Sequence, residues 1–371
     1  MEFFVEKSDL MRALNFVRHG AEKRCTMPVL SHFLLEAEGF ELRITATDLE
    51  VAARTTCQAK VKAKGSAVVP GLRFLDIVRS ASSGEVRCRT LENHSVQVTF
   101  GKSSFKIVGL AKSDFPDFPS IPKPIATLDA GLLRDCVEKT SFAVSAQESR
   151  YVLNGALLKL KPDSMTMVAT DGHRLALVER KAQISNLKGE LSVLIPQRML
   201  QVLPQLAEDG GEGASIEVSK NESHLCFSLG SSILASRLLI GEFPNYEAVL
   251  PKEFGKAVEL NPEELRDVLR RVSLLADERV PGVRLALEKD RLEVLASSPE
   301  YGEAKESVET RYGQEALDIG FNAEYLLDFL RAVGTKVSIR MQVKDAASAV
   351  EFRPCGEDGH SYRYVLMPLR F

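Results

Sequence analysis

One structural pattern occurs three times along this chain of 371 residues. Amphipathic helix patterns lie at 8–20, 129–141 and 262–277, about 125 residues apart. In the third copy, apolar residues recur every three or four positions, as on one buried face of a helix. Asn261 and Pro262 provide its N-cap and first-turn proline. A repeat of this length constrains the fold strongly because every copy must adopt the same structure.

Three further elements repeat in the same order. A strand that ends in Ala-Thr-Asp occurs at 44–48 and 168–171, with a degraded copy at 292–298. Next come a strand that ends in proline and leads into a helix, and a strand that leads to Phe-Pro. The strand that ends in proline and its helix occupy 68–78, 194–203 and 319–330. The strand that leads to Phe-Pro, or its counterpart in the third copy, lies at 115–116, 243–244 and 364–371. A chance coincidence of common patterns is the alternative explanation.

The repeat predicts an α+β fold made of three tandem copies of one domain, each with two helices packed on antiparallel sheets. The alternation of apolar and polar residues at 95–100 and 103–108 predicts a hairpin of half-buried strands. Proline-containing breaks at 120–125 and 250–255 separate the copies. We therefore expect domains at 1–122, 126–251 and 255–371.

The composition excludes several classes of protein. Hydrophobic residues make up 44% of the chain and charged residues 27%, which is typical of globular proteins. The six cysteines are scattered singly, so zinc sites and Cys-x-x-Cys redox motifs are not expected. The N-terminus lacks a signal-peptide pattern, and no apolar run is long enough to span a membrane. We expect a cytoplasmic protein with free thiols, no metal, no cofactor and no membrane partner.

The sequence offers one candidate catalytic pair, Asp171 and His173 in the run Ala-Thr-Asp-Gly-His-Arg-Leu. A monomeric hydrolase or nuclease built on this pair is the alternative function. The first copy of the run keeps Asp48 but has no histidine, as expected if the aspartate only shapes a turn. Gly101-Lys102-Ser103 resembles the end of a phosphate-binding loop, but it lies between two strands and lacks the required earlier glycine.

The net charge of −3 argues against a nucleic-acid partner unless the charges are segregated. Arg12, His19 and Lys23 lie opposite the apolar face of the first helix pattern, and Arg266 and Arg270 repeat this arrangement. Acidic residues concentrate in the loops. If the helices lie on one side of the domains, a basic surface would face DNA and bind phosphates without sequence preference. Solvated helix faces, or a repeat scaffold with no role on DNA, are the alternatives.

Four stretches resemble the bacterial DNA polymerase III beta sliding clamps: Arg150–Gly155, Ala169–Ala176, Phe243–Pro251 and the ending Met367–Phe371. The resemblance covers the whole chain. It implies a ring-forming homodimer whose two chains join head to tail, with helices lining the bore and sheets outside. Such a ring is not an enzyme: it encircles duplex DNA, slides along it and tethers the replicative polymerase. A clamp loader and other replication and repair proteins are the further implied partners.

The resemblance also implies binding residues. The partner-peptide groove would be lined by Leu153, Thr170, Gly172, His173, Arg174, Leu175, Pro244, Val249, Tyr325, Val365, Leu366, Met367, Pro368, Leu369 and Arg370. Its apolar pockets would take Leu and Phe side chains of a short peptide. The DNA contacts would be Arg24, Arg73, Gln147, Tyr151 and Arg198, and Leu274 and Leu275 would lie at the dimer interface. Ala248, Ala349 and Val152 depart from the family pattern, which puts the peptide flank and one DNA contact in question.

Overall fold

The computed structural model describes residues 1–21, 27–82, 84–277, 279, 281–356 and 360–369. The chain divides into two compact units, which are described separately. Unit 1 comprises 1–134, 184–188 and 198–238, and unit 2 comprises 135–183, 189–197 and 239–371. The division passes through helices α3 (Ala130–Thr140) and α4 (Gln197–Leu200), in the middle of the second sequence repeat. The domain boundaries expected from the sequence therefore stay predictions.

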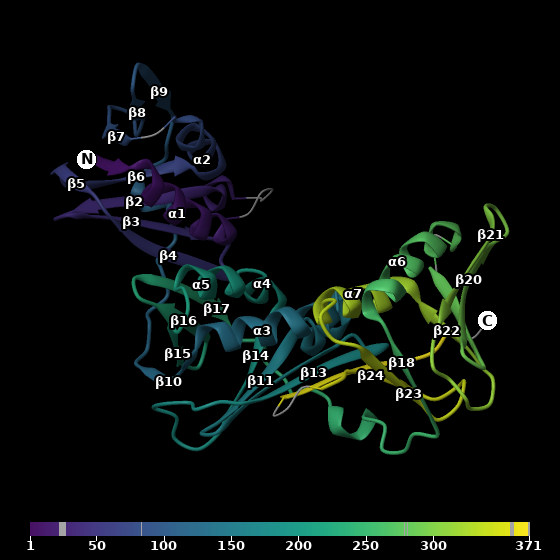
Figure 1. Ribbon diagram of the computed structural model, residues 1–371. Helices are drawn as coiled ribbons and strands as arrows, with labels where there is room; N and C mark the ends of the chain where they lie inside the picture. Colours follow the sequence, from purple (N-terminus) through teal and green to yellow (C-terminus); the bar gives the residue numbers. More distant parts are fainter. Residues whose placement is uncertain (22–26, 83, 278, 280, 357–359, 370–371) are drawn as a thin grey trace. The chain divides into compact units, whose positions relative to one another are not determined.

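Unit 1 contains two antiparallel sheets (Figure 1). The five-stranded sheet has the order β5-β1-β7-β8-β9, and its strands are β1 (Glu2–Glu6), β5 (Lys60–Ala63), β7 (Glu85–Thr90), β8 (Val96–Phe100) and β9 (Ser103–Ile107). The eight-stranded sheet has the order β10-β15-β16-β17-β4-β3-β2-β6. Its strands are β2 (His32–Glu38), β3 (Glu41–Thr47), β4 (Val51–Gln58), β6 (Gly65–Pro70), β10 (Pro124–Asp129), β15 (Ser215–Lys220), β16 (His224–Leu229) and β17 (Ser232–Arg237).

The helices of unit 1 bury one apolar face each. Helix α1 (Lys7–Val17) packs on β3 and β4, and α2 (Gly71–Ser80) lies beside it (Figure 1). The predicted helix that follows Pro196 is broken into α4 and α5 (Leu203–Asp209), with Pro204 in the first turn of α5. Short 3₁₀ turns complete the unit: η1 (Arg18–Gly20), η2 (Pro28–Ser31) and η3 (Lys112–Asp114). The predicted hairpin at 95–108 is present as β8 and β9.

Unit 2 repeats this plan. Its eight-stranded sheet has the order β14-β11-β12-β13-β25-β24-β23-β18, and its four-stranded sheet has the order β21-β20-β19-β22. The larger sheet consists of β11 (Gly155–Lys161), β12 (Ser164–Thr170), β13 (Arg174–Lys181), β14 (Leu191–Pro196), β18 (Lys256–Leu260), β23 (Ile339–Val343), β24 (Val350–Pro354) and β25 (His360–Leu366). The smaller consists of β19 (Gly282–Glu288), β20 (Arg291–Ser298), β21 (Gly302–Glu309) and β22 (Leu317–Asn322).

Helices α6 (Pro262–Val272) and α7 (Ala323–Val333) lie side by side in unit 2, and α6 packs on β20 and β21 (Figure 1). The predicted cap is confirmed, because Asn261 Oδ1 accepts from the backbone N–H groups of Glu263 and Glu264. The 3₁₀ turns are η4 (Ser141–Ala143), η5 (Glu148–Leu153), η6 (Tyr246–Val249) and η7 (Ser273–Leu275). Among the described residues, no helix is long and apolar enough to cross a membrane.

In each unit, one strand pair joins two sequence repeats into a single sheet. In unit 1, β4 of the first repeat pairs with β17 of the second; in unit 2, β13 of the second pairs with β25 of the third. We call these two strand pairs the seams. Strands β4 and β13 both follow the strand that ends in Ala-Thr-Asp, and β17 and β25 are both the third strand after a repeat's second helix. Equivalent strands of the repeats therefore form both seams.

Candidate partner-binding and DNA-binding surfaces

The Ala-Thr-Asp motif forms a tight turn between β12 and β13. Asp171 Oδ1 accepts from the backbone N–H groups of His173 (2.9 Å) and Arg174 (3.0 Å), and Asp171 Oδ2 accepts from Arg174 Nε (3.1 Å). Thr170 Oγ1 donates to O of Arg174 and accepts from N of Gly172. Both oxygens of the Asp171 carboxylate are thus occupied by the turn that it shapes.

The first repeat has the same turn. Asp48 Oδ1 accepts from N of Glu50 (3.0 Å) and of Val51 (2.7 Å), and Asp48 Oδ2 accepts from Arg198 Nε (3.1 Å). Because no histidine accompanies Asp48, the motif is explained by turn geometry rather than by acid–base chemistry. Among the described residues, no group of three or more His, Cys, Asp or Glu side chains could hold a metal ion.

Arg174 is the centre of a polar network in unit 2. Its Nη1 donates to Asp328 Oδ2 (2.7 Å), its Nη2 donates to O of Phe142 (2.6 Å), and its guanidinium lies 4.1 Å from the centre of the Tyr325 ring. Burial raises the pKa of Tyr325, and Asp171 raises it further. Only 9% of the Arg174 side chain is exposed. Arg174 therefore supports the surface around the turn.

An apolar cluster lies beside this network. Its buried members are Leu157, Val168, Leu175, Leu177, Leu194, Tyr246 and Val365, and Leu239, Phe243, Leu250 and Ala349 pack against them. The β13–β25 seam places Leu175 opposite Val365. After β25, N of Met367 donates to O of His173 (2.9 Å), and N of Leu369 donates to O of Gly320 (2.8 Å). Backbone hydrogen bonds thus fix the C-terminal segment next to the Asp171 turn.

The predicted groove residues of unit 2 differ in exposure. Leu153, Leu175, Val365 and Leu366 are buried, Thr170, Arg174, Tyr325, Pro368 and Leu369 are half-buried, and Gly172, His173, Pro244, Val249 and Met367 are exposed. Arg370 lies outside the described residues. The β13–β25 seam brings the predicted residues at 170–175 next to those at 365–369. The Arg174 guanidinium, which lies over the Tyr325 ring, places Tyr325 beside them. Sequence reasoning missed Phe142 and Asp328; only the position of Asp328, one helical turn after Tyr325, could have suggested it.

The predicted DNA contacts fall in both units. In unit 1, Arg73 is exposed on α2, whereas Arg198 is held by Asp48 beside a depression also lined by Arg18, His19, Arg79, Glu50 and Asp76. In unit 2, Gln147 and Tyr151 are exposed at η5, and 52% of Tyr151 is accessible. Arg24 lies outside the described residues, as does Lys23.

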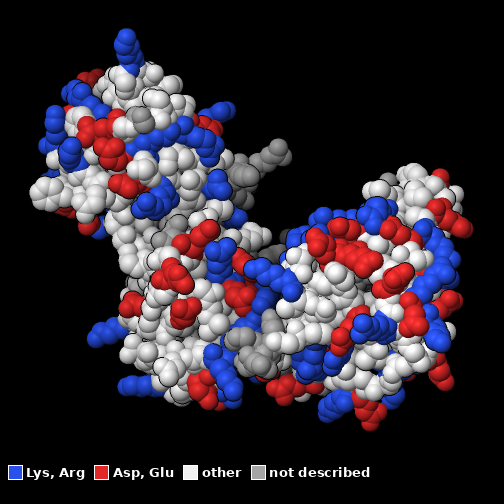
Figure 2. Space-filling view, viewed as in Figure 1, with Lys and Arg blue, Asp and Glu red and all other residues white. Residues whose placement is uncertain are grey.

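The helices carry both signs of charge. Ion pairs join Arg12 to Asp9, Arg79 to Asp76, Arg266 to Glu263, Arg271 to Glu306 and Arg331 to Asp328. Figure 2 shows acidic and basic side chains interspersed over the visible face. Because these pairs neutralise much of the positive charge, phosphate attraction by the described helices is weaker than their arginines alone suggest.

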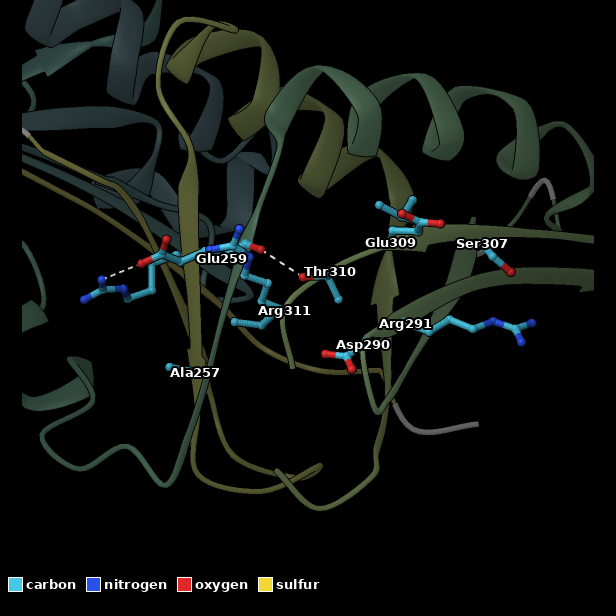
Figure 3. Close-up of a pocket in the computed structure, with 11 residues that line it drawn as sticks. Ala257, Glu259, Asp290, Arg291, Ser307, Glu309, Thr310 and Arg311 are labelled. Atoms are coloured by element: carbon cyan, nitrogen blue, oxygen red, sulfur yellow. Dashed lines mark hydrogen bonds and ion pairs between the residues drawn. The ribbon is translucent and has the colours of Figure 1, made fainter. Parts of the chain in front are cut away.

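A second polar depression lies in unit 2, between β18 and the ends of β20 and β21 (Figure 3). Arg340 Nη2 donates to Glu259 Oε1 (2.6 Å), and Thr310 Oγ1 donates to O of Glu259 (3.0 Å). Arg291 and Arg311 also line it, together with Asp290 and Glu309. Its charges are mixed, and none of its residues belongs to a predicted site.

The candidate dimer residues lie beside a free sheet edge. Leu274 is 77% exposed and Leu275 is half-buried, both on η7, which packs on β20 and β21. Strand β21 is the outer strand of its sheet in unit 2, and β9 is the outer strand of its sheet in unit 1. These two edges are available for pairing with another chain.

Three sequence repeats and open antiparallel sheets define a protein built from repeated α+β domains. The models of the N-terminal, central and C-terminal domains of the DNA polymerase III beta subunit match residues 1–119, 127–245 and 247–370. The beta sliding clamps of Pseudomonas putida and Escherichia coli are 34% and 31% identical over 100% of this chain and 100% of each relative. A crystal structure of the DNA polymerase III subunit beta from Pseudomonas aeruginosa matches with a TM-score of 0.88, 33% identity and full coverage of both chains.

The chain belongs to the DNA polymerase III beta subunit family, the beta sliding clamps. The family prediction and the three-domain α+β fold are confirmed. The chain is a processivity clamp, a non-catalytic subunit, and the alternative of a hydrolase built on Asp171 and His173 is not supported.

Proposed function

We propose that two copies of this chain join head to tail into a ring that encircles duplex DNA, slides along it and tethers the replicative polymerase. The seams carry this proposal. Each seam pairs the strand after an Ala-Thr-Asp element with the third strand after a second helix. In the third repeat, β21 is the strand that follows the Ala-Thr-Asp element, and in the first repeat, β9 is the third strand after the second helix. Neither takes part in a seam, and each is a sheet edge within its own unit. A β9–β21 pair between two chains would supply the missing seam twice.

The side chains of these two edges support their pairing. Lys102 and Lys106 are exposed at β9, and Glu303 and Glu309 are exposed on β21, whose exposed Lys305 is already paired with Glu293. Opposite charges favour approach and register, and like charges across the edge would oppose it. Leu274, next to β21, adds exposed apolar surface of the kind that a partner buries. We propose Leu274 and Leu275 as interface residues on these grounds.

The surface around the Asp171 turn is our candidate for the partner-peptide groove. A buried apolar cluster adjoins the exposed side chains of Val249 and Met367, and the exposed side chain of His173 at the turn adds a polar group. This combination suits a short peptide whose apolar side chains anchor it while its backbone is hydrogen-bonded. The replicative polymerase, the clamp loader and other replication and repair proteins would share this surface in the cytoplasm.

Residence on DNA would be topological. A closed ring cannot leave duplex DNA sideways, so it needs no tight contact with phosphates, and tight contacts would slow sliding. The mixed charges of the helices are compatible with this mechanism because they leave few uncompensated cations per helix. Exposed Arg73, Gln147 and Tyr151 are our candidates for the remaining DNA contacts, together with Arg24 and the partly engaged Arg198.

Mass and retention on DNA test the proposal. The ring requires a particle of about twice 40.9 kDa in sedimentation equilibrium. After loading, the protein should stay on nicked circular plasmid during gel filtration and leave when the plasmid is linearised. A strict monomer at micromolar concentration, or equal loss from circular and linear DNA, contradicts the ring.

A single substitution separates the clamp from the hydrolase. His173→Ala should weaken the binding of a fluorescein-labelled peptide ending in Leu-Phe and leave ring retention on circular DNA unchanged, because the exposed side chain of His173 lies at the turn and not at a sheet edge. A hydrolase would instead show turnover that this variant abolishes. Unchanged peptide binding would argue against the proposed groove.

A further inference from the structure

Arg150 connects the two candidate binding surfaces of unit 2. It lies in η5, between the predicted DNA contacts Gln147 and Tyr151, at a residue whose backbone leaves the helical conformation (φ −110°, ψ 54°). Its Nη1 donates to O of Asp171 at 2.7 Å. Asp171 in turn holds the backbone of His173 and Arg174. One guanidinium therefore connects the DNA-facing candidate segment to the turn at the rim of the peptide groove.

The glycine next to Asp171 makes room for this guanidinium. Gly172 has φ +90°, and a Cβ built on it would lie 2.4 Å from Arg150 Nη1. The equivalent residue of the first repeat is Leu49, which adopts φ +74° in the same turn. A side chain can therefore occupy this backbone conformation. A Cβ at position 172 would therefore displace the Arg150 guanidinium from its place beside the Asp171 carbonyl.

The segment around Arg150 is braced internally. N of Ser145 donates to O of Leu153 (2.9 Å), which closes the segment at its base. With its amide in the orientation that satisfies both groups, Asn154 donates to O of Gln147 (2.8 Å) and to O of Arg150 (3.1 Å). The Asn154 side chain thus holds the carbonyls of Gln147 and Arg150 together, and its backbone N donates to O of Tyr151 (3.2 Å), so all three residues are bonded to Asn154.

We propose that Arg150 is a positioning residue that couples DNA contact at η5 to peptide binding at the 170–174 turn, so that each ligand strengthens binding of the other. The inference rests on the proposed function. DNA against Gln147 and Tyr151 restrains η5, Arg150 transmits the restraint to the Asp171 carbonyl, and the rim is already ordered when the peptide arrives. By linkage, a bound peptide must strengthen DNA binding by the same factor.

Peptide affinity measured in two conditions tests the coupling. Fluorescence anisotropy of a labelled peptide ending in Leu-Phe is recorded with the ring alone and with the ring saturated by a short linear duplex, which can enter a closed ring end-on. We expect wild-type affinity to rise about fivefold or more with DNA. The ratio of peptide affinity with DNA to peptide affinity without DNA measures the coupling. In Arg150→Ala this ratio should fall to about one, because the link is absent.

A second variant removes the link without removing the charge. Gly172→Ala leaves the arginine in place but inserts a Cβ where Arg150 Nη1 lies, so the ratio should also fall to about one. Gly189→Ala is the matched control: Gly189 has φ +78° and no atom within 4 Å of an added Cβ. This control introduces similar backbone strain in the same unit and should keep the wild-type ratio.

The outcomes separate the coupling from the proposed function. A wild-type ratio of one, or a preserved ratio in Arg150→Ala or Gly172→Ala, overturns the coupling. A loss in Arg150→Ala alone also overturns it, because the arginine would then act only as a phosphate contact. Failure of the wild-type ring to bind the peptide, or to be retained on circular DNA, instead contradicts the proposed function.

Discussion

At the scale of single residues, two aspartates perform the same task in different surroundings. Asp48 and Asp171 both close a turn through two backbone N–H groups and both accept from an arginine Nε. The sequence predicted this equivalence because both follow Ala-Thr. It did not predict the arginines, since Arg198 lies 150 residues from Asp48. Residues so far apart carry no spacing pattern that could link them.

Removing the Asp171 carboxylate should destabilise unit 2. Asp171→Ala leaves two N–H groups and Nε of the nearly buried Arg174 without their acceptor, although Asp328 still pairs with the guanidinium, so we expect a loss of about 2 kcal/mol in unfolding free energy. Urea unfolding followed by circular dichroism measures it. Asp163→Ala, at the exposed β11–β12 hairpin, is the control and should change little. A loss no larger than the control's would contradict the structural role.

Three thiols, those of buried Cys136 and Cys226 and of half-buried Cys57, should be chemically inert in the native protein. Burial raises the pKa of Cys136 and of Cys57 to about 12, and that of Cys226 to about 11. A thiol with a raised pKa is almost entirely protonated at pH 8, and the thiolate is the reactive form. Iodoacetamide at pH 8 should therefore label these three residues only after urea is added, as mass spectrometry of peptides can determine. Rapid labelling of the native protein would refute this.

At the scale of elements, helix patterns were predicted well where the chain itself supplies the boundary signals. Asn261 and Pro262 begin α6, and Asn322 caps α7 through N of Glu324 and of Tyr325. The prediction was wrong after Pro196, where a single helix was expected. Pro204 cannot donate a backbone hydrogen bond and sits in a first helical turn, so α4 ends and α5 begins instead.

The cap of α7 should be worth a measurable amount. Asn322→Ala removes the acceptor for two backbone N–H groups, and we expect a loss of about 1 kcal/mol in unfolding free energy. Glu6→Ala is a suitable comparison because Glu6 occupies the same position before α1 without making a cap hydrogen bond. Equal effects of the two substitutions on the thermal midpoint would argue against the cap.

At the scale of the whole molecule, the repeat predicted three similar domains but not the compact units. Each unit forms around a seam, and seams arise from strand pairing between distant segments, which periodicity along the chain cannot reveal. Net charge was also a poor guide. Several arginines of the described helices are held in ion pairs while others, such as Arg73, are exposed, so neither a basic nor an acidic total describes the surface that DNA would meet.

The β9 edge gives a prediction about assembly. Lys106→Glu reverses the charge of a β9 side chain that we expect to face the largely acidic β21 edge of a second chain, so the dimer should dissociate about tenfold more readily in sedimentation velocity. Lys62→Glu makes the same charge change on β5, at the opposite edge of the same sheet, and should leave the dimer intact. Equal dissociation constants for the two variants would rule out β9 as the interface.

The seam in unit 2 has a mechanical consequence. Strands β13 and β25 are antiparallel over seven residue pairs, and the 367–369 segment leaves the Leu366 end of β25 directly beside the rim. A pull on that segment along the strand direction loads the backbone hydrogen bonds in parallel, so they share the force rather than breaking one after another. A moving polymerase would thus drag the ring through a joint loaded in shear, the geometry in which a strand pair resists separation best.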